Sequence, residues 1–286
     1  MNKIINRILK GKHNRDFAFD LYLPEGNSPE NGWPIIVFAH GFKGFKDWGH
    51  WSKIGEVFVE AGFAFLKFNF AFNGTTIEAP NDFADLEAFG QNNFSKELSD
   101  VQTVLDYLSE SAPQHDIDLD QLTLIGHSRG GPIALLTAAK DKRVKSVITW
   151  AAVHELDYAW QSPKNLEKWK TEGVVYALNG RTGQQMPMYY QLYEDFLANK
   201  ALYNLKNALK RFSKPMLIIH GDADPAVKLS SAEYLKKLVP SAELKIIEAA
   251  DHVFGGKHPF PSNAEMPEHS EVLILYSIDF LMNEQF

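Results

Sequence analysis

Cysteine is missing from this sequence of 286 residues. Its absence excludes disulfide bonds, zinc–thiolate sites and a cysteine nucleophile. Hydrophobic residues make up 45% of the chain and charged residues 23%, which is typical of a globular protein with a sizeable core. Because cysteine is absent, any nucleophilic chemistry must depend on another residue type.

Long apolar runs and basic runs are also missing. No apolar stretch approaches the roughly 20 residues that a membrane span needs, and charges interrupt residues 1–15 so often that no signal-peptide core forms. The net charge is -7 and no basic stripe is present, which argues against a nucleic-acid partner. We therefore expect a cytoplasmic protein that binds neither nucleic acid nor membranes. These features do not predict its oligomeric state.

The stretch of residues 122–136 contains a Gly-x-Ser-x-Gly motif centred on Ser128. An apolar strand-like run enters the motif and a helix-like run leaves it. A serine hydroxyl is a weak nucleophile, so it must be raised on a sharp turn beside a base. Gly126 and Gly130 suit such a turn because side chains at these positions would collide where strand and helix meet.

Strand patterns and helix patterns alternate along most of the chain, which predicts an α/β fold. We expect a mostly parallel central sheet of about eight strands flanked by helices. The first two strands should form an antiparallel pair at its edge, and residues 71–92 should form a long loop. Strands are predicted over 3–10, 17–23, 34–41, 62–70, 121–125, 144–151, 214–221 and 244–248, and helices over 51–61, 95–109, 133–139, 229–238 and 271–282.

Residues 153–212 break this alternation and are predicted to form an inserted cap of helices and a hairpin, the latter over 173–182 with an Asn-Gly turn. Residues 1–152 and 213–286 would then form the core. The cap is rich in aromatic residues, which either line a substrate pocket or pack as the cap's own small core. The candidates for substrate contact are Trp160, Tyr189 and Tyr190.

Four loops that follow predicted strands carry polar or glycine-rich residues, at 40–43, 126–130, 221–227 and 250–253. In a parallel α/β sheet, such loops converge on one crevice at the carboxyl ends of the strands. Together they offer oxyanion donors, a nucleophilic serine, an acid and a histidine base, the last three in the chain order Ser, Asp, His. The chain therefore has candidates for each part of a nucleophilic site.

On these motifs the chain resembles an α/β hydrolase, with Gly-His-Ser-Arg-Gly similar to the nucleophile elbow and His-Gly-Phe similar to the oxyanion loop. Within that superfamily it resembles the small bacterial carboxylesterases that include cinnamoyl and feruloyl esterases. Dienelactone hydrolases are similar in layout but use a cysteine nucleophile, which this chain lacks. The resemblance implies an α/β-hydrolase fold and hydrolysis without a cofactor or metal.

The resemblance assigns roles to residues of this chain. Ser128 is expected to attack an acyl carbonyl while His252 takes its proton, and a carboxylate holds the other nitrogen of the imidazole. The related pattern Gly-x-x-Asp-x-x-Val favours Asp224 as that carboxylate, with Asp222 as the alternative. The backbone N–H groups of Phe42 and Arg129 are expected to stabilise the oxyanion.

The predicted function is hydrolysis of a small-molecule carboxylic ester through an acyl-enzyme. A serine peptidase is the nearest alternative, and an acidic cap residue such as Glu155, Asp157 or Glu194 would then bind the amino terminus of the substrate. An acyltransferase and a non-catalytic binding protein on the same fold are further alternatives, since fold alone does not define function.

Overall fold

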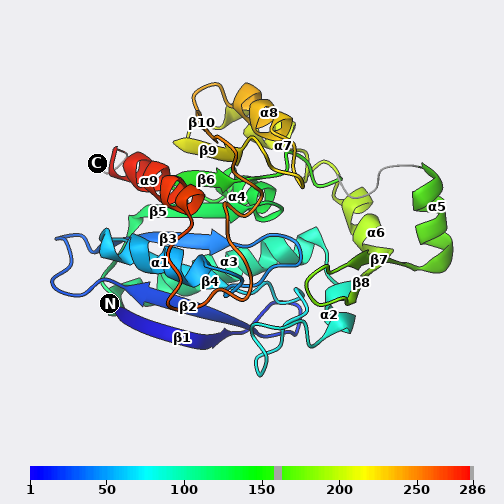
Figure 1. Ribbon diagram of the computed structural model, residues 1–286, viewed down its shortest axis with the longest axis horizontal. Helices are drawn as coiled ribbons and strands as arrows, with labels where there is room; N and C mark the ends of the chain where they lie inside the picture. The colour runs from blue at the N-terminus through cyan, green and yellow to red at the C-terminus, as the bar shows by residue number, and fades with distance from the viewer. Residues whose placement is uncertain (158–162, 284–286) are drawn as a thin grey trace.

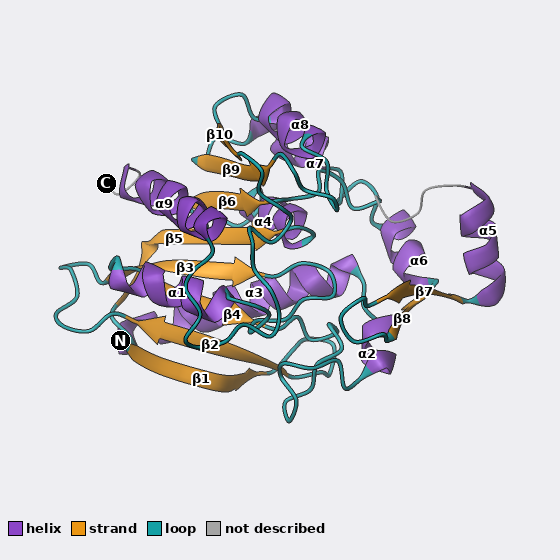
Figure 2. Cartoon of the chain, in the orientation of Figure 1, coloured by secondary structure: helices purple, strands orange, loops and turns teal. Residues whose placement is uncertain are grey.

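The protein is described by a computed structural model that covers residues 1–157 and 163–283. Its centre is an eight-stranded sheet with the order β1-β2-β4-β3-β5-β6-β9-β10 (Figures 1 and 2). The expected α/β architecture with about eight mostly parallel strands is thus confirmed. The strands are β1 (Asn2–Leu9), β2 (Phe17–Leu23), β3 (Trp33–Ala39), β4 (Ala64–Phe68), β5 (Ile117–His127), β6 (Ser146–Trp150), β9 (Met216–Gly221) and β10 (Glu243–Ile247).

Strand direction follows the predicted pattern. β1 pairs antiparallel with β2 at one edge, and β2 pairs antiparallel with β4. All the pairings from β4 through β3, β5, β6 and β9 to β10 are parallel. The central strands consist of nearly continuous apolar residues because both of their faces are covered.

Helices cover both faces of the sheet (Figure 2). The core cluster on one face includes side chains of α1 (Trp51–Glu60) and α9 (Glu268–Asn283). The cluster on the other face includes side chains of α3 (Phe94–Ser111), α4 (Gly130–Ala138) and α8 (Ser230–Leu238). α3 begins where the Asn93 side chain accepts a hydrogen bond from the Lys96 N–H at 3.0 Å. Among the described residues, no helix combines the length and apolar character needed to cross a bilayer.

The segment between β6 and β9 projects to one side of the sheet (Figure 1). It contains α5 (Pro163–Glu172), β7 (Val174–Leu178), β8 (Gln185–Tyr189), α6 (Gln191–Ala198), α7 (Leu205–Ala208) and the 3₁₀ turn Leu209–Arg211. β7 and β8 form a separate two-stranded antiparallel sheet. We refer to residues 153–212 as the cap segment.

Two local predictions were wrong. The hairpin extends beyond residue 182, because its connection is a broad turn closed by hydrogen bonds between Asn179 and both Gly183 and Gln184, rather than a two-residue Asn-Gly turn. The predicted loop 71–92 contains the short helix α2 (Leu86–Gly90). The Asp85 side chain caps this helix by accepting a hydrogen bond from the Ala88 N–H at 2.9 Å.

Candidate active site

Ser128 lies at the sharp turn between β5 and α4. Its φ is +53°, a left-handed conformation that is uncommon for a residue with a side chain. The turn is possible because its neighbours have no Cβ: a Cβ at Gly126 would lie 2.3 Å from the Gly130 carbonyl oxygen, and one at Gly130 would lie 2.3 Å from the Ala39 oxygen. The backbone therefore presents the serine side chain at the carboxyl end of β5.

Three side chains from different loops form a hydrogen-bonded chain at this edge of the sheet. The Oγ of Ser128 lies 3.0 Å from Nε2 of His252. The Nδ1 of His252 lies 2.7 Å from Oδ2 of Asp224. Since the carboxylate accepts the Nδ1 proton, Nε2 is left as the acceptor that faces the serine hydroxyl. This tautomer is the one that can remove a proton from Ser128.

The Asp224 side chain is completely buried. Its Oδ1 accepts hydrogen bonds from the backbone N–H groups of Ala226 and Val227 at 2.7 and 2.9 Å. Burial by itself raises the pKa of Asp224, but the hydrogen bond from His252 and those two backbone donors more than offset it and lower the pKa below its ordinary value. The carboxylate is therefore held in its charged form.

Asp222, the alternative acid, is not hydrogen-bonded to His252 within the described residues. Its Oδ1 accepts the N–H of Ala249 at 2.6 Å. The contact joins the loop after β9 to the loop after β10, so Asp222 fixes the backbone near the site. Of the two aspartates, Asp224 is the one hydrogen-bonded to the imidazole.

Two other histidines lie close to Ser128 but are engaged elsewhere. His127 donates its Nε2 proton to the carbonyl of His252 at 2.9 Å, and burial lowers its pKa to about 3. His40 donates from Nδ1 to the carbonyl of Gly41 at 2.9 Å, and burial lowers its pKa to about 4. Both rings are neutral at ordinary pH and support the backbone around the serine.

The loop after β3 brings Phe42 next to Arg129. The Arg129 guanidinium lies 4.5 Å from the centre of the Phe42 ring and forms a buried ion pair with Glu97 at 2.7 Å. Gly41 is packed so closely that a Cβ there would lie 2.8 Å from the Cβ of Ser128. Within the described residues, we find no hydrogen bond from the backbone N–H of Phe42 or of Arg129. Both donors are thus free to bind an oxyanion.

A buried network of four charges anchors the same loop, and sequence reasoning missed it. Lys46 and Lys67 both donate to Oδ2 of Asp20, at 2.8 and 2.7 Å, and both also contact Asp47. Burial by itself lowers the pKa of Lys67, but the carboxylates of Asp47 and Asp20 raise it above its ordinary value. The network connects the loop after β3 to β2 and β4. No sequence pattern marks it, because its members come from separate elements.

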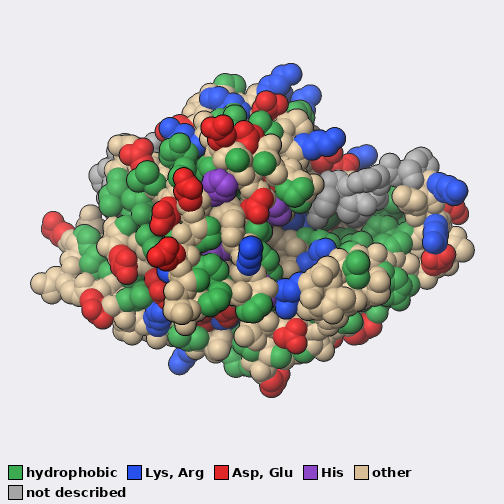
Figure 3. Space-filling view, viewed as in Figure 1, with side chains coloured by type: hydrophobic (Ala, Val, Ile, Leu, Met, Phe, Trp, Pro, Cys, Tyr) green, Lys and Arg blue, Asp and Glu red, His purple; other side chains and the backbone are tan. Residues whose placement is uncertain are grey.

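A cavity of about 220 Å³ lies beside His252. It is bounded by the loop after β3, by His127 and by the turn of the β7–β8 hairpin, and its lining includes Trp48, Lys43 and Arg181. Figure 3 shows histidine and basic side chains around a hollow near the middle of this face. The cavity therefore adjoins the imidazole that is hydrogen-bonded to Ser128.

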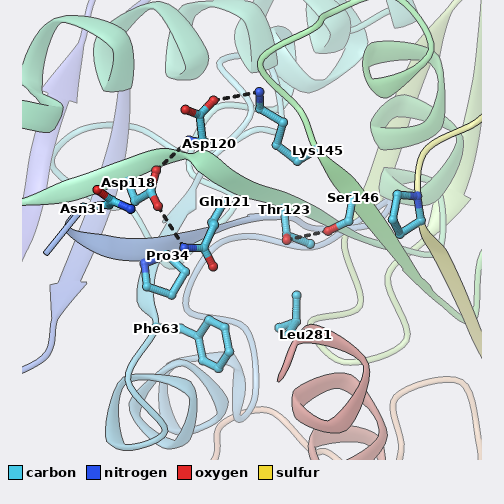
Figure 4. A pocket seen from close by; sticks show the side chains of 11 residues that line it. Asn31, Pro34, Phe63, Asp118, Asp120, Gln121, Thr123, Lys145, Ser146 and Leu281 are labelled. Atoms are coloured by element: carbon cyan, nitrogen blue, oxygen red, sulfur yellow. Dashed lines mark hydrogen bonds and ion pairs between the residues drawn. The ribbon is translucent and has the colours of Figure 1, made fainter. Parts of the chain in front are cut away.

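A second cavity, of about 580 Å³, lies at the opposite ends of the strands (Figure 4). Several of its polar side chains bind one another: Asp118 with Gln121, Asp120 with Lys145, and Thr123 with Ser146. It is separated from Ser128 by the length of the strands. We therefore place the candidate site at the carboxyl edge.

Tyr189 and Tyr190, two of the aromatic residues predicted for substrate contact, pack against other protein groups. The Tyr189 hydroxyl donates to Glu87, and its ring lies against Gly90 of α2. Tyr190 contacts the rings of Trp169 and Tyr193, with centroids 5.9 and 5.7 Å away. Neither lines the cavity beside His252. Tyr190 thus belongs to a small aromatic core of the cap segment, whereas Tyr189 joins the cap segment to α2.

Trp160, the third aromatic candidate, lies outside the described residues. The acidic candidates for an amino-terminus site, Glu155, Asp157 and Glu194, do not line the cavity beside His252 either. The cap residues that do line it are Asn179 and Arg181, in the hairpin turn. The Asn-Gly pair predicted a turn at this place in the sequence, but no sequence feature indicated that the turn faces the site.

This sheet order and the placement of these loops define the protein as an α/β hydrolase, as its motifs predicted. The chain belongs to the BD-FAE family, which matches residues 19–239. The predicted resemblance to bacterial feruloyl esterases agrees with a similarity to Est1E from Butyrivibrio proteoclasticus, solved with ferulic acid bound. That structure superimposes with a TM-score of 0.72 at 20% identity, covering 97% of this chain and 98% of Est1E.

The proteins similar in sequence include the following two. The 2,6-dihydropseudooxynicotine hydrolase of Paenarthrobacter nicotinovorans is 24% identical over 80% of this chain, which spans about half of that enzyme's length (53%). A Mycoplasma pneumoniae protein named as an esterase/lipase is 25% identical over 76% of this chain and 81% of its own. The chain is thus a hydrolase by family, with esterases among its relatives.

Proposed function

We propose that this protein hydrolyses carboxylic esters of small molecules through an acyl-enzyme on Ser128. The observation that supports this most directly is the hydrogen-bonded chain from the Ser128 hydroxyl through His252 to Asp224, with distances of 3.0 and 2.7 Å. A serine positioned in this way is activated by the neighbouring base.

In the first half of the reaction, Oγ of Ser128 attacks the acyl carbonyl while Nε2 of His252 takes its proton. The tetrahedral intermediate places its negative oxygen near the N–H groups of Phe42 and Arg129. His252 then gives the proton to the leaving alcohol, and the C–O bond of the ester breaks. The products of this half are the alcohol and an ester of Ser128.

In the second half, water replaces the alcohol. His252 removes a proton from the water as its oxygen attacks the acyl carbon, and a second tetrahedral intermediate forms. The proton then returns to Oγ of Ser128, and the acid leaves. Asp224 remains a carboxylate throughout and stabilises the imidazolium that forms in each half.

A peptidase is a weaker candidate. A substrate with a free amino terminus carries a positive charge, and the cavity beside His252 is lined by Lys43 and Arg181 without any acidic residue. Like charges in one partly buried site repel each other. A neutral or anionic ester suits this cavity better.

A fluorophosphonate probe tests the proposal, because it bonds covalently to an activated serine. We expect labelling of the native protein and none of Ser128→Ala. Equal labelling of the two proteins would refute Ser128 as the nucleophile. A panel of aryl, hydroxycinnamoyl and short-chain alkyl esters, measured beside aminoacyl amides, distinguishes the reactions: hydrolysis of the amides alone would favour the peptidase.

A further inference from the structure

The cavity beside His252 carries polar groups that ester hydrolysis itself does not use. Lys43 belongs to the loop after β3, whereas Asn179 and Arg181 belong to the turn between β7 and β8. All three line the same cavity, and no aspartate or glutamate lines it with them. Two segments far apart in the chain thus contribute three side chains with hydrogen-bond donors to the lining of one space next to the proposed catalytic histidine.

Asn179 has a buried donor with no partner. Its residue is only 7% exposed, and its Oδ1 accepts the backbone N–H of Arg181 at 3.2 Å. This bond fixes the orientation of the side-chain amide, so Nδ2 is the amide atom that is still available as a donor. Within the described residues, Nδ2 has no hydrogen-bond partner. A buried unpaired donor is unfavourable, so an acceptor supplied by a ligand would stabilise it.

The two cations lack acidic partners. Lys43 is half-buried, and its ammonium donates to the carbonyl of Leu178 at 3.0 Å and lies 5.7 Å from the centre of the Phe42 ring, so neither contact is with a carboxylate. Among the ion pairs of the described residues, none involves Lys43 or Arg181. The nearby carboxylate of Asp47 already contacts Lys46 and Lys67. The lining of the cavity therefore contains two cationic side chains and no acidic one.

We propose that this cavity binds a carboxylate carried by the substrate, so that the preferred substrates are esters with a free carboxylate besides the scissile bond. This inference rests on the proposed esterase function. A carboxylate offers two oxygens, which match the forked donors of Arg181 together with the ammonium of Lys43 and the amide of Asn179. Trp48 and Trp51 line the same cavity and would contact the carbon skeleton of the substrate.

Matched ester pairs test the proposal. The acyl side is probed by 4-nitrophenyl valerate against mono-4-nitrophenyl glutarate, and the alcohol side by 4-methylphenyl acetate against 4-carboxyphenyl acetate. For each pair, the measured quantity is the ratio of kcat/KM for the charged ester to that for the neutral ester. Comparing this ratio between variants cancels the intrinsic reactivity of the esters. The pair that responds shows which side of the substrate enters the cavity.

Two variants change the cavity, and one serves as a charge-matched control. Arg181→Gln removes one cation, while Asn179→Asp keeps the acceptor for the Arg181 N–H and replaces the free donor with a negative oxygen. We expect the ratio for the responding pair to fall by about tenfold in each. Arg211→Gln removes a positive charge from an exposed position of the cap segment, away from the cavity, and should retain the native ratio.

Salt provides a further check, because Arg181 is exposed and its attraction is screened. Raising the ionic strength should lower the native ratio and affect the Arg181→Gln ratio less. Ratios for both pairs that stay within twofold of the native values in Arg181→Gln and Asn179→Asp would overturn the proposal.

Binding separates failure of this proposal from failure of the esterase function. If no ester is turned over and no serine is labelled, the esterase proposal is wrong. Calorimetry of Ser128→Ala with monomethyl glutarate and with 4-carboxyphenyl acetate still measures the cavity from both sides of the ester, since it needs no turnover. Binding of either ester that weakens in Ser128→Ala/Arg181→Gln supports the anion site, whereas no binding of either ester to Ser128→Ala, or equal binding of both esters to the two proteins, refutes it.

Discussion

Replacing Asp224 with asparagine tests the proposed triad most sharply, because the structure predicts how the new amide would sit. Two backbone donors, from Ala226 and Val227, face one oxygen of the native carboxylate. In Asp224→Asn, the amide would direct its oxygen at these two donors, and its NH₂ group would then face His252. Nδ1 of the imidazole would have to accept, so Nε2 would carry the proton.

That tautomer cannot take a proton from Ser128, whose hydroxyl lies 3.0 Å from Nε2. In serine hydrolases with this arrangement, the same substitution lowers kcat by roughly 10⁴-fold, equivalent to about 5.5 kcal/mol of transition-state stabilisation. We expect a loss of similar size in Asp224→Asn, with little change in KM.

The matched control is Asp222→Asn, two residues away on the same loop. Its amide oxygen can still accept the N–H of Ala249, so we expect a loss in kcat of less than about threefold. The assay is steady-state hydrolysis of 4-nitrophenyl butyrate, with circular dichroism to verify that both variants are folded. A greater loss in Asp222→Asn than in Asp224→Asn would refute the assigned acid.

Three further substitutions test the loop, the buried charges and pH dependence. In Gly41→Ala, the new Cβ would lie 2.8 Å from that of Ser128 and displace the loop. We therefore expect kcat to fall by roughly 10²-fold, which is the effect of losing one oxyanion donor. Native kinetics in this variant would contradict the prediction. Lys67→Met should lower the free energy of unfolding in urea by about 3–5 kcal/mol, because it leaves buried carboxylates without their cation. The control is Lys3→Met at a partly exposed ion pair, which should lower the free energy of unfolding by less than about 1 kcal/mol. Equal losses in the two variants would refute the buried network. Burial lowers the pKa of His50 to about 4, so the unfolded chain binds this proton more readily and native stability falls as pH drops from about 6.5 toward 4. His50→Gln should make this fall shallower by up to about 1.4 kcal/mol per pH unit, and an unchanged slope in urea unfolding would contradict it.

Local patterns in the sequence predicted most of the secondary structure. Alternating residues identified the β1–β2 pair, and continuous apolar runs identified the buried strands. The short helix α2 was missed because its five residues are too few to show a helical period and it is held by a single cap at Asp85. The hairpin turn was predicted wrongly because an Asn-Gly pair occurs in broader turns as well as in two-residue turns. The hydrogen bond from the Gly183 N–H to the Asn179 carbonyl, which closes this turn, depends on the backbone conformation.

The order of the strands in the sheet brings together residues whose contacts the sequence pattern did not predict. β4 lies between β2 and β3, so Lys67 and Asp20, which are far apart in the chain, meet beneath the loop that carries Lys46. Similarly, Lys43 contacts the carbonyl of Leu178 at the end of β7 only because the cap segment folds back over the carboxyl edge. Neither contact is encoded in the spacing of neighbouring residues.

The sequence by itself determined the strand, turn and helix around Ser128, the chain order of serine, acid and base, and the class of hydrolase, because each depends on residues a few positions apart or on their order. Only the tertiary structure decided that Asp224 rather than Asp222 reaches His252, and that two cations and a free amide share the adjacent cavity. Those distances depend on how separate loops converge at the ends of the strands. The physical reason is that local backbone preferences act over one turn or strand, whereas side chains from distant segments are brought together by packing of the whole sheet.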